Sequence, residues 1–263
     1  MKNKPHIIFI GAGNLATNLA LALYQHDFSI KQVYSRTLDS AEMLAKKVNS
    51  TYTNQLEELI LGSYLYIVSL RDDALLKLLP NIMKGKKNAL VIHTAGSIPM
   101  DVLSDYGTRY GVLYPMQTFS KSRIVSFDTI PFFIEANNEF DKQLLISIAS
   151  ELSSKVFEAD SSQRKKLHLA AVFASNFTNH MYTLSAQILD KYGLPFESMH
   201  SLIEETTQKI YNVAPIDAQT GPAIRNDQDV MTEHLKMLSD FPDLQEIYRV
   251  LSNSILKHKI DKK

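Results

Sequence analysis

Cysteine is absent from this 263-residue chain. The sequence therefore excludes disulfide bonds, thiol catalysis and thiolate ligands for a metal, and we expect no metal site. A chain without cysteine also fits a reducing compartment, so we predict a cytoplasmic protein.

Net charge is lacking too, because 28 lysine and arginine residues balance 28 aspartate and glutamate residues. This balance gives no reason to expect a nucleic-acid or membrane partner. Long apolar runs are also missing. The first apolar stretch of the chain is short and is interrupted by Gly11 and Gly13, so it is not typical of a signal peptide. A later uncharged stretch, Leu167 to Leu189, contains histidines and asparagines that are too polar for a membrane span.

What remains is an ordinary globular composition in which strand-like and helical patterns alternate along the first half of the chain. The expected strands are Ile7–Ile10, Ile30–Tyr34, Leu65–Leu70, Ala89–His93, Gly111–Leu113, Pro131–Ile134 and Lys155–Glu158. The expected helices are Leu15–Tyr24, Ser40–Val48, Gln55–Ile60, Asp73–Met83 and Phe140–Ser153. This alternation predicts an α/β fold with a doubly wound, mostly parallel sheet and helices on both faces.

Only helical periodicity follows Asp160. The expected helices are Gln163–Tyr192, Glu197–Val213, Asp227–Leu238 and Leu244–His258, with glycines and prolines between them. We therefore predict two domains, an α/β domain of residues 1–160 and an all-α domain of residues 161–263.

A glycine-rich segment joins the first expected strand to the first expected helix. It matches the Gly-x-Gly-x-x-Gly/Ala pattern of Rossmann-like dinucleotide-binding folds. Gly11 allows a tight turn, Gly13 leaves room for a pyrophosphate, and Ala16 lets the helix pack closely on the strand. The helix N-terminus, at Asn14 and Leu15, offers free N–H groups to the phosphates. A tight structural turn without a ligand is the alternative.

The end of the second expected strand indicates which dinucleotide binds. An NAD site usually places a carboxylate there, but this chain has Ser35, Arg36 and Thr37. A guanidinium between two hydroxyls suits a ribose 2′-phosphate, so we predict NADP as the cofactor. Asp39 is close enough in sequence to reach a ribose, but we expect it to cap the next helix in a capping box with Glu42.

The nicotinamide end of the cofactor is expected over the carboxyl ends of two later strands, near Ser69, His93 and Gly96. Gly96 would let a flat ring approach. His93 is a catalytic candidate, although a histidine at a strand end is often only a hydrogen-bonded structural residue. Other polar residues expected in the same cleft are Thr94, Ser97, Tyr114, Gln117, Thr118 and Ser120. Asp72 or Asp73 is expected to be a helix N-cap and not a catalytic acid.

The uncharged stretch Leu167 to Leu189 predicts a helix that is buried nearly all round. Its apolar side would hold Phe173, Phe177, Met181, Leu184 and Ile188. Its polar side would hold His168, Ser175, Asn176, Asn179 and Thr183. Because buried polar groups need partners, that side faces an active cleft, a subunit contact or interhelical network, or a packed core.

Two residues of the helical half are candidates for contact with a substrate. His168 could donate a proton to a substrate oxygen or nitrogen, because imidazole titrates near neutral pH. A satisfied interior histidine is the alternative. Arg225 lies at the turn before an expected helix that Asn226 or Asp227 would cap. Its guanidinium could clamp a substrate carboxylate, or it could pair with Asp227.

Taken in order, GAGNLATNLALAL, Ser-Arg-Thr, HTAGS, YPMQTFS, HLAAVFASNFTNHMY and TGPAIRND cover nearly the whole chain. With these motifs it resembles bacterial oxidoreductases that join a Rossmann-like NADP-binding domain to a C-terminal helical domain of unknown function. It is more distantly similar to pyrroline-5-carboxylate reductases, deazaflavin-dependent NADP reductases and prephenate dehydrogenases. The resemblance implies NADP as cofactor and a homodimer formed through the C-terminal helices.

Departures from these relatives limit what the resemblance implies. β-Hydroxyacid dehydrogenases use a helix lysine with an asparagine four residues later, but here Lys166 is followed by Ala170. His168 begins the corresponding polar row. The Gly-Gly-Thr-Thr turn of pyrroline-5-carboxylate reductases is replaced by Gly-Pro-Ala-Ile-Arg. The resemblance therefore implies the cofactor and not the named reactions.

Together these features predict an NADP-dependent oxidoreductase that transfers hydride to or from a small C=O or C=N substrate, which could also bear a carboxylate. His168 is the expected proton donor, and Asn176 and Arg225 would orient the substrate. One alternative is a prephenate-dehydrogenase-like enzyme. The other is an NADP-binding regulatory or scaffold protein without turnover.

Overall fold

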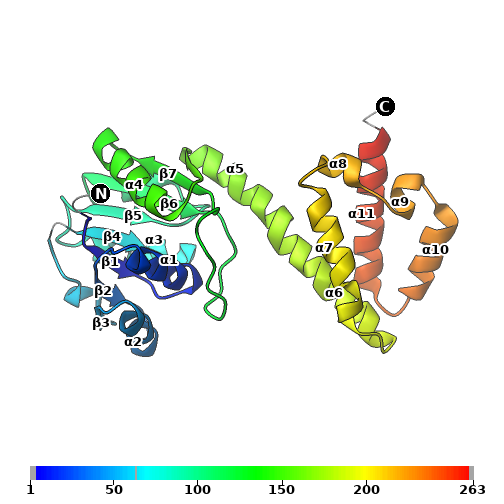
Figure 1. Cartoon of the computed structure of the whole chain (residues 1–263), viewed down its shortest axis with the longest axis horizontal. Helices are drawn as coiled ribbons and strands as arrows, with labels where there is room; N and C mark the ends of the chain where they lie inside the picture. Colours follow the sequence, from blue (N-terminus) through cyan, green and yellow to red (C-terminus); the bar gives the residue numbers. More distant parts are fainter. Residues whose placement is uncertain (1–3, 63, 261–263) are drawn as a thin grey trace. The chain divides into compact units, whose positions relative to one another are not determined.

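The computed structural model describes residues 4–62 and 64–260 of the chain (Figure 1). The chain forms two compact units, Met1–Asn176 and Phe177–Lys263. The division between the units therefore falls after Asn176 and not after residue 160, where we expected it. Helix α5, which starts at Ser161, belongs with the first unit.

The first unit contains a sheet whose strand order is β3-β2-β1-β4-β5-β6-β7-β8. The strands are β1 (Ile7–Ile10), β2 (Ile30–Tyr34), β3 (Thr51–Thr53), β4 (Leu65–Val68), β5 (Leu90–His93), β6 (Arg109–Pro115), β7 (Phe132–Ala136) and β8 (Val156–Glu158). Neighbours are parallel except β6 and β7. The chain proceeds outward from β1 to β3 and then returns to β4 on the other side of β1. This order confirms the predicted Rossmann-like sheet and places a ligand crevice beyond the carboxyl ends of β1 and β4.

Helices cover both faces of this sheet. They are α1 (Asn14–Gln25), α2 (Leu38–Lys47), α3 (Asp72–Met83) and α4 (Glu139–Leu152). Helix α5 (Ser161–Ala171) follows β8 and leads away from the sheet, and 3₁₀ turns lie at Leu56–Glu58 and Met100–Leu103 (Figure 1). The helix expected over Gln55–Ile60 is therefore only a 3₁₀ turn. Strand β3, which we did not predict, is a short, largely exposed Thr-Tyr-Thr segment at the sheet edge, so it lacks an apolar run.

The core of the first unit follows from the alternation of side chains along each strand. Ile7 and Phe9 of β1 join a cluster with residues of α1, α2 and α4. Ile8 and Ile10 join a second cluster with residues of α3 on the opposite face. Since all four side chains are fully buried, β1 is fixed in place between two helical layers, and so is the glycine-rich loop that follows it.

Two expected helix caps are wrong. Helix α2 has Thr37 as its N-cap residue, with no side-chain cap hydrogen bond, so Asp39 lies in the first turn and no capping box forms. Helix α3 has Arg71 at this position, so Asp72 and Asp73 also lie in the first turn. Each helix starts earlier than the sequence suggested. The carboxylates then interact favourably with the helix dipole and do not bind the terminal N–H groups as caps.

The regular secondary structure in the described part of the second unit is all helical, as predicted. Its helices are α6 (Thr178–Lys191), α7 (His200–Lys209), α8 (Pro215–Ala218), α9 (Pro222–Arg225), α10 (Gln228–Met237) and α11 (Pro242–Ile260), with a 3₁₀ turn at Phe196–Met199. The single helix expected over Gln163–Tyr192 is interrupted by a π-helical segment, Val172–Phe177, between α5 and α6. In the described part of the chain, no helix meets the length and apolarity needed to cross a bilayer.

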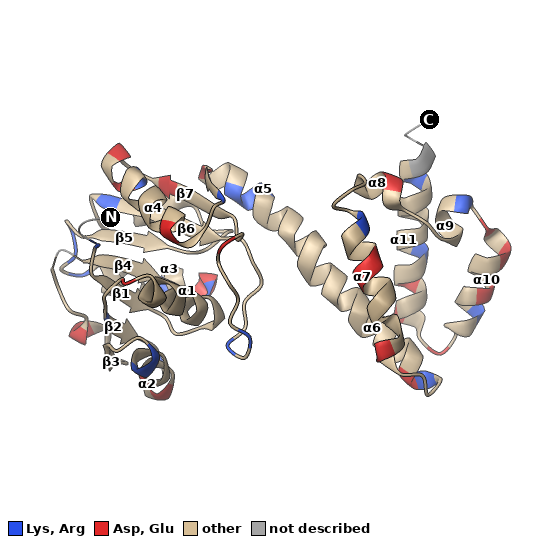
Figure 2. Cartoon of the chain, in the orientation of Figure 1, with Lys and Arg blue, Asp and Glu red and all other residues tan. Residues whose placement is uncertain are grey.

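The prediction that Leu167 to Leu189 is buried nearly all round is wrong for the single chain. Leu169 is 61% exposed and Phe173 is 64% exposed. Figure 2 shows that the ribbon between the charged start of α5 and the charged end of α6 carries neither lysine, arginine, aspartate nor glutamate. The lack of charge therefore does not mark a helix inside the core of this chain.

Candidate functional site

The loop after β1 has the backbone that a dinucleotide requires. Gly11 adopts φ of +121°, and an added Cβ there would lie 2.1 Å from the Ser69 carbonyl oxygen, so only glycine fits. Gly13 is exposed, and an added Cβ there would meet no atom within 4 Å. Gly11 is thus required by the fold, whereas the bare backbone at Gly13 leaves an open surface for a ligand.

Helix α1 begins at this open surface with its terminal N–H groups uncapped. Its N-cap residue is Gly13, no side chain makes a cap hydrogen bond, and its first turn contains no acidic residue. Uncapped N–H groups and the positive end of the helix dipole attract an anion. These features fit a pyrophosphate, as predicted for Gly13, Asn14 and Leu15.

The residues expected to select NADP lie together after β2. Ser35 is half-buried and its N–H donates to the Thr53 carbonyl at 3.2 Å, while Arg36 and Thr37 are exposed. Within the described ranges, the Arg36 guanidinium forms no ion pair. A free, exposed guanidinium flanked by hydroxyls fits a 2′-phosphate.

A cavity of about 630 Å³ opens beside the N-terminus of α1 within the first unit, and Asn14 and Leu15 are part of its lining. Further polar lining residues are Thr94, Tyr114, Gln117, Thr118, Ser175 and Asn176. Gly96 and His168 also line it, whereas Ser69 and Ser120 do not. The described residues that line this cavity include no lysine, arginine, aspartate or glutamate, so its polar contacts come from neutral groups and one histidine.

His93 does not have the accessibility that a catalytic role requires. Its side chain is fully buried, and the Ala95 N–H donates to its Nδ1 at 3.2 Å. Burial, together with the nearby Arg164 charge, lowers the pKa of His93 to about 3, although the Pro99 backbone acts in the opposite direction. Its Nε2 makes no hydrogen bond of ordinary geometry with a described residue. A buried, neutral imidazole that contacts the Ala95–Gly96 turn favours the structural interpretation over direct catalysis.

The lack of a side chain at Gly96 has a packing role that was not predicted. An added Cβ would lie 2.7 Å from His168 Nδ1 and 2.8 Å from Tyr114 Cζ. In the direction of a Cβ, the space next to this glycine is therefore filled by two side chains, while Gly96 still lines the cavity. The sequence did not reveal this packing role, because no local pattern shows that β6 and α5 meet over this loop.

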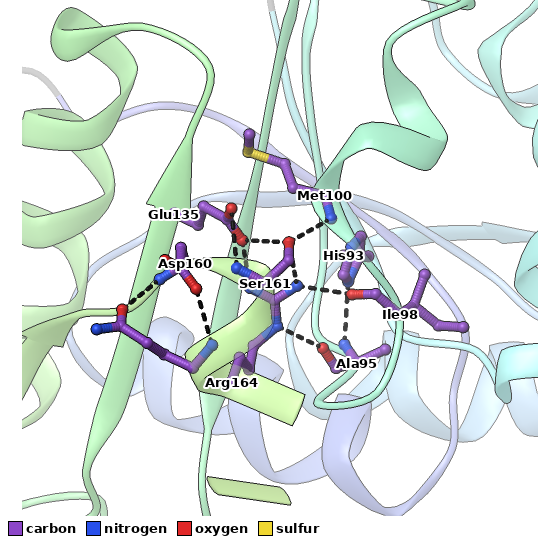
Figure 3. Close-up of polar contacts among 9 residues, drawn as sticks. His93, Ala95, Ile98, Met100, Glu135, Asp160, Ser161 and Arg164 are labelled. Atoms are coloured by element: carbon purple, nitrogen blue, oxygen red, sulfur yellow. Dashed lines mark hydrogen bonds and ion pairs between the residues drawn. The ribbon is translucent and has the colours of Figure 1, made fainter. Parts of the chain in front are cut away.

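An arginine that the sequence analysis missed joins the loop after β5 to the start of α5 (Figure 3). Arg164 is fully buried, and its Nη2 donates to the Ile98 carbonyl at 2.6 Å and its Nε to the Ala95 carbonyl at 3.2 Å. Its Nη1 pairs with Glu135 of β7. The guanidinium thus holds both ends of the loop that contains Gly96.

Ser161 extends this network. Its hydroxyl donates to Glu135 at 2.8 Å and accepts from the Met100 N–H at 2.9 Å (Figure 3). Because Arg164 and His168 lie one helical turn apart, the network also fixes the side of α5 that faces the cavity. The sequence alone gives no signal for this role, because Arg164 stands beside Lys165 and Lys166 in one basic run. In the structure both lysines are exposed, whereas Arg164 is buried.

Asn18 is a second missed residue, and it ties the segment after β6 to α1. Its Nδ2 donates to the carbonyls of Asn14 and Ser120, each at 2.9 Å, and its Oδ1 accepts from the Val125 N–H at 3.2 Å. This fully buried amide holds in place the segment whose residues Gln117 and Thr118 line the cavity.

The remaining predicted residues are divided between the units. Asn176 is exposed on the π-helical segment and lines the cavity together with Ser175. Such π-helical segments inside α-helices often mark functional sites. Arg225 is exposed on α9 in the second unit, 3.9 Å from Asp227, so its contact with a substrate stays a prediction. Asp227 caps α10 by accepting from the Val230 N–H at 3.3 Å, as predicted.

Comparison with known proteins gives two family matches. Residues 6–96 match the family described as NADP oxidoreductase, coenzyme F420-dependent, and residues 130–255 match a domain of unknown function, DUF2520. The crystal structure of a putative NADP oxidoreductase from Bacteroides fragilis is 56% identical, with a TM-score of 0.92. The alignment covers 97% of this chain and 98% of that one.

More distant solved structures share the fold. An imine reductase from Myxococcus stipitatus, solved with NADP⁺, is 17% identical with a TM-score of 0.70, covering 96% of this chain and 92% of that one. A pyrroline-5-carboxylate reductase from Coxiella burnetii is also 17% identical, with a TM-score of 0.61 and 98% of each chain covered. No match is found among curated proteins.

The match with the Bacteroides fragilis protein extends over nearly the whole of both chains, and the two family models match the two halves. The resemblance inferred from the motifs is therefore confirmed, and so is the predicted cofactor class. This chain belongs to the family of NADP oxidoreductases that join a Rossmann-like domain to a helical domain of unknown function.

Proposed function

We propose that this protein binds NADP(H) across the β1–α1 loop and uses it to reduce or oxidise a small carbonyl or imine compound. The observation that carries the proposal is the open backbone at Gly13 beside an uncapped helix N-terminus, next to a cavity lined by His168. Gly11, Gly13, Asn14 and Leu15 would hold the pyrophosphate. Ser35, Arg36 and Thr37 would hold the 2′-phosphate.

The site chemistry divides between the cofactor and the chain. When bound, NADPH supplies a hydride to the substrate carbon, and the protein supplies position and a proton. His168 would donate that proton to the carbonyl oxygen or imine nitrogen, becoming neutral as the new O–H or N–H bond forms. Asn176 would orient the substrate from the same wall, and Arg225 would bind a carboxylate if the substrate has one. His93 has no direct role in this proposal, because it is buried.

The cofactor assignment can be tested by measuring NADPH and NADH binding to the wild type and to Arg36→Ala by calorimetry. We expect Arg36→Ala to weaken NADPH binding by roughly 10- to 100-fold, since hydrogen bonds to charged groups contribute about 1.5–3 kcal/mol. NADH binding should hardly change. Lys47→Ala removes an exposed charge at the other end of α2 and is the matched control. Equal loss for both nucleotides would contradict the role of Arg36, and no binding of either would remove the proposal.

Turnover separates an enzyme from a scaffold that binds NADP without reacting. NADPH oxidation measured against a panel of small ketones, aldehydes and cyclic imines should identify at least one substrate. His168→Asn should then lower the turnover number while NADPH binding stays at the wild-type level. Wild-type turnover in His168→Asn would exclude this residue as the proton donor.

We also propose that two copies of the chain associate through the helical unit. Large apolar side chains remain exposed there, among them Leu202 on α7 and Val250 on α11. Exposed apolar surface of this kind usually marks a protein contact, and a second copy presents the same surface. Leu202→Asp should shift the protein towards monomer in sedimentation velocity runs. Gln208→Asp, at an exposed polar position of the same helix, should not. A monomeric wild type at micromolar concentration would contradict this.

A further inference from the structure

Two side chains from distant parts of the sequence meet on the cavity wall. The Tyr114 hydroxyl, at the end of β6, lies 3.2 Å from His168 Nδ1 on α5. Their rings meet edge to face, with centroids 6.2 Å apart. Both residues line the cavity proposed to hold the reacting groups. This contact was not predicted, because it depends on how α5 packs against the sheet.

The direction of the hydrogen bond follows from the surroundings of the tyrosine. Tyr114 is buried, which raises the pKa of its phenol, and the Arg164 charge offsets part of that increase. The phenol therefore keeps its proton at neutral pH. Among the described residues, its hydroxyl makes no other hydrogen bond, so donation to Nδ1 is the way to satisfy the buried O–H. A neutral imidazole that accepts at Nδ1 carries its own proton on Nε2.

We propose that Tyr114 is a positioning residue that holds His168 as the Nε2–H tautomer, so that Nε2 is the nitrogen left for the substrate. This inference rests on the proposed function, because it specifies which atom of His168 would deliver the proton. The pairing also suits the protonated imidazole, in which Nδ1–H donates to the phenol oxygen. In both states the ring keeps its orientation and presents Nε2–H to the substrate. Delivery of the Nε2 proton by the cation leaves the neutral ring with its proton on Nδ1. The ring returns to the Nε2–H tautomer when Nε2 takes a proton from solvent and Nδ1 releases one.

Gly96 and Arg164 support this arrangement independently. At Gly96 the absence of a Cβ lets the phenol and the imidazole approach each other across the loop. Arg164 fixes the same loop and the same helix through the carbonyls of Ala95 and Ile98. Since each partner is held by a rigid element, little further ordering is needed to form the pair.

The test reads the tautomer directly in the protein without cofactor. The imidazole nitrogens are labelled with ¹⁵N, and their shifts are recorded by long-range ¹H–¹⁵N correlation, with His168→Asn used to assign the signal. We expect the wild type to be predominantly Nε2–H. In Tyr114→Phe the ratio of Nε2–H to Nδ1–H should fall by roughly tenfold, the value of about one hydrogen bond. Tyr110→Phe, on the same strand, should leave the ratio unchanged.

A second variant guards against a general disturbance of the fold. Gly96→Ala keeps the hydroxyl but forces the two side chains apart, so it should shift the tautomer in the same direction, with both variants melting cooperatively. An Nδ1–H tautomer in the wild type, or an unchanged ratio in Tyr114→Phe, would overturn the inference. Because this measurement uses no nucleotide, failed NADPH binding would count against the proposed function and leave the tautomer result intact.

Discussion

The two units differ in how completely they bury their apolar residues. In the first unit, strands β1, β4 and β5 are buried along their whole length between two helical layers. In the described part of the second unit, only Ala223 and Leu238 among the hydrophobic residues are buried. Tyr211 is 76% exposed and Leu202 is 62% exposed. The α/β unit thus has its own core, whereas the helical unit leaves much of its apolar surface exposed.

This difference indicates that side chains are held more firmly in the first unit than in the second. A site needs side chains that are held in place by packing and by hydrogen bonds, and the first unit supplies both around its cavity. Arg164 and Asn18 are fully buried amid hydrogen bonds that hold the cavity walls. Substitutions should therefore be costly at buried polar positions of the first unit and mild in the second.

The largest effect is expected at Arg164. Arg164→Met should lower the free energy of unfolding by about 3–5 kcal/mol, because Glu135 would lose its ion-pair partner. Denaturant unfolding measures this change, and Arg123→Met at an exposed position should cost less than about 0.5 kcal/mol. Adding Glu135→Leu to Arg164→Met should restore part of the loss. A small effect of Arg164→Met alone would contradict the view that this network holds the first unit together.

An intermediate effect is expected from the protonation of His93. The folded state lowers its pKa to about 3, so the unfolded state binds one more proton when the pH lies between that value and the ordinary 6.5. Its contribution to stability is therefore complete above about pH 6.5 and is lost as the pH falls towards about 3. At about pH 5 the loss should be about 2 kcal/mol relative to about pH 7.

Free energies of unfolding, measured across this pH range for the wild type and for His93→Gln, test whether the loss of stability comes from His93. The variant should show a shallower decline with falling pH, whatever its stability at about pH 8, because glutamine does not titrate. Identical slopes for the two proteins would show that His93 does not bear the acid sensitivity of the first unit.

The smallest effect is expected in the second unit, at the cap of α10. Asp227→Ala removes the acceptor for the Val230 N–H and should cost about 1 kcal/mol. Asp227→Asn retains a cap and should stay close to the wild type. Thermal melting at two protein concentrations measures the stability of both variants. The proposed self-association predicts a higher melting temperature at the higher concentration. A loss as large as that expected for Arg164→Met would remove the contrast between the units.

Much of the fold could be predicted because it depends on local patterns. Apolar runs located the strands of the buried sheet, and the glycine-rich turn gave the order of strand, loop and helix. Failures occurred where a segment was short or polar. Strand β3 is an example, because its alternating Thr-Tyr-Thr has no apolar run. The uncharged helical stretch failed for another reason, since a lack of charge does not say which surface covers a helix.

The residues of the candidate site divide in the same way, into those that a local pattern predicts and those that only packing brings together. The sequence by itself determined the backbone at Gly11 and Gly13 and the cation at Arg36, because these depend on residue type beside a strand end. Only the tertiary structure decided that His93 is buried, that Gly96 is packed against two side chains, and that Tyr114 meets His168. The physical reason is that burial and hydrogen bonding between β6 and α5 depend on packing across many residues of separation, and no local pattern records which side chains will meet.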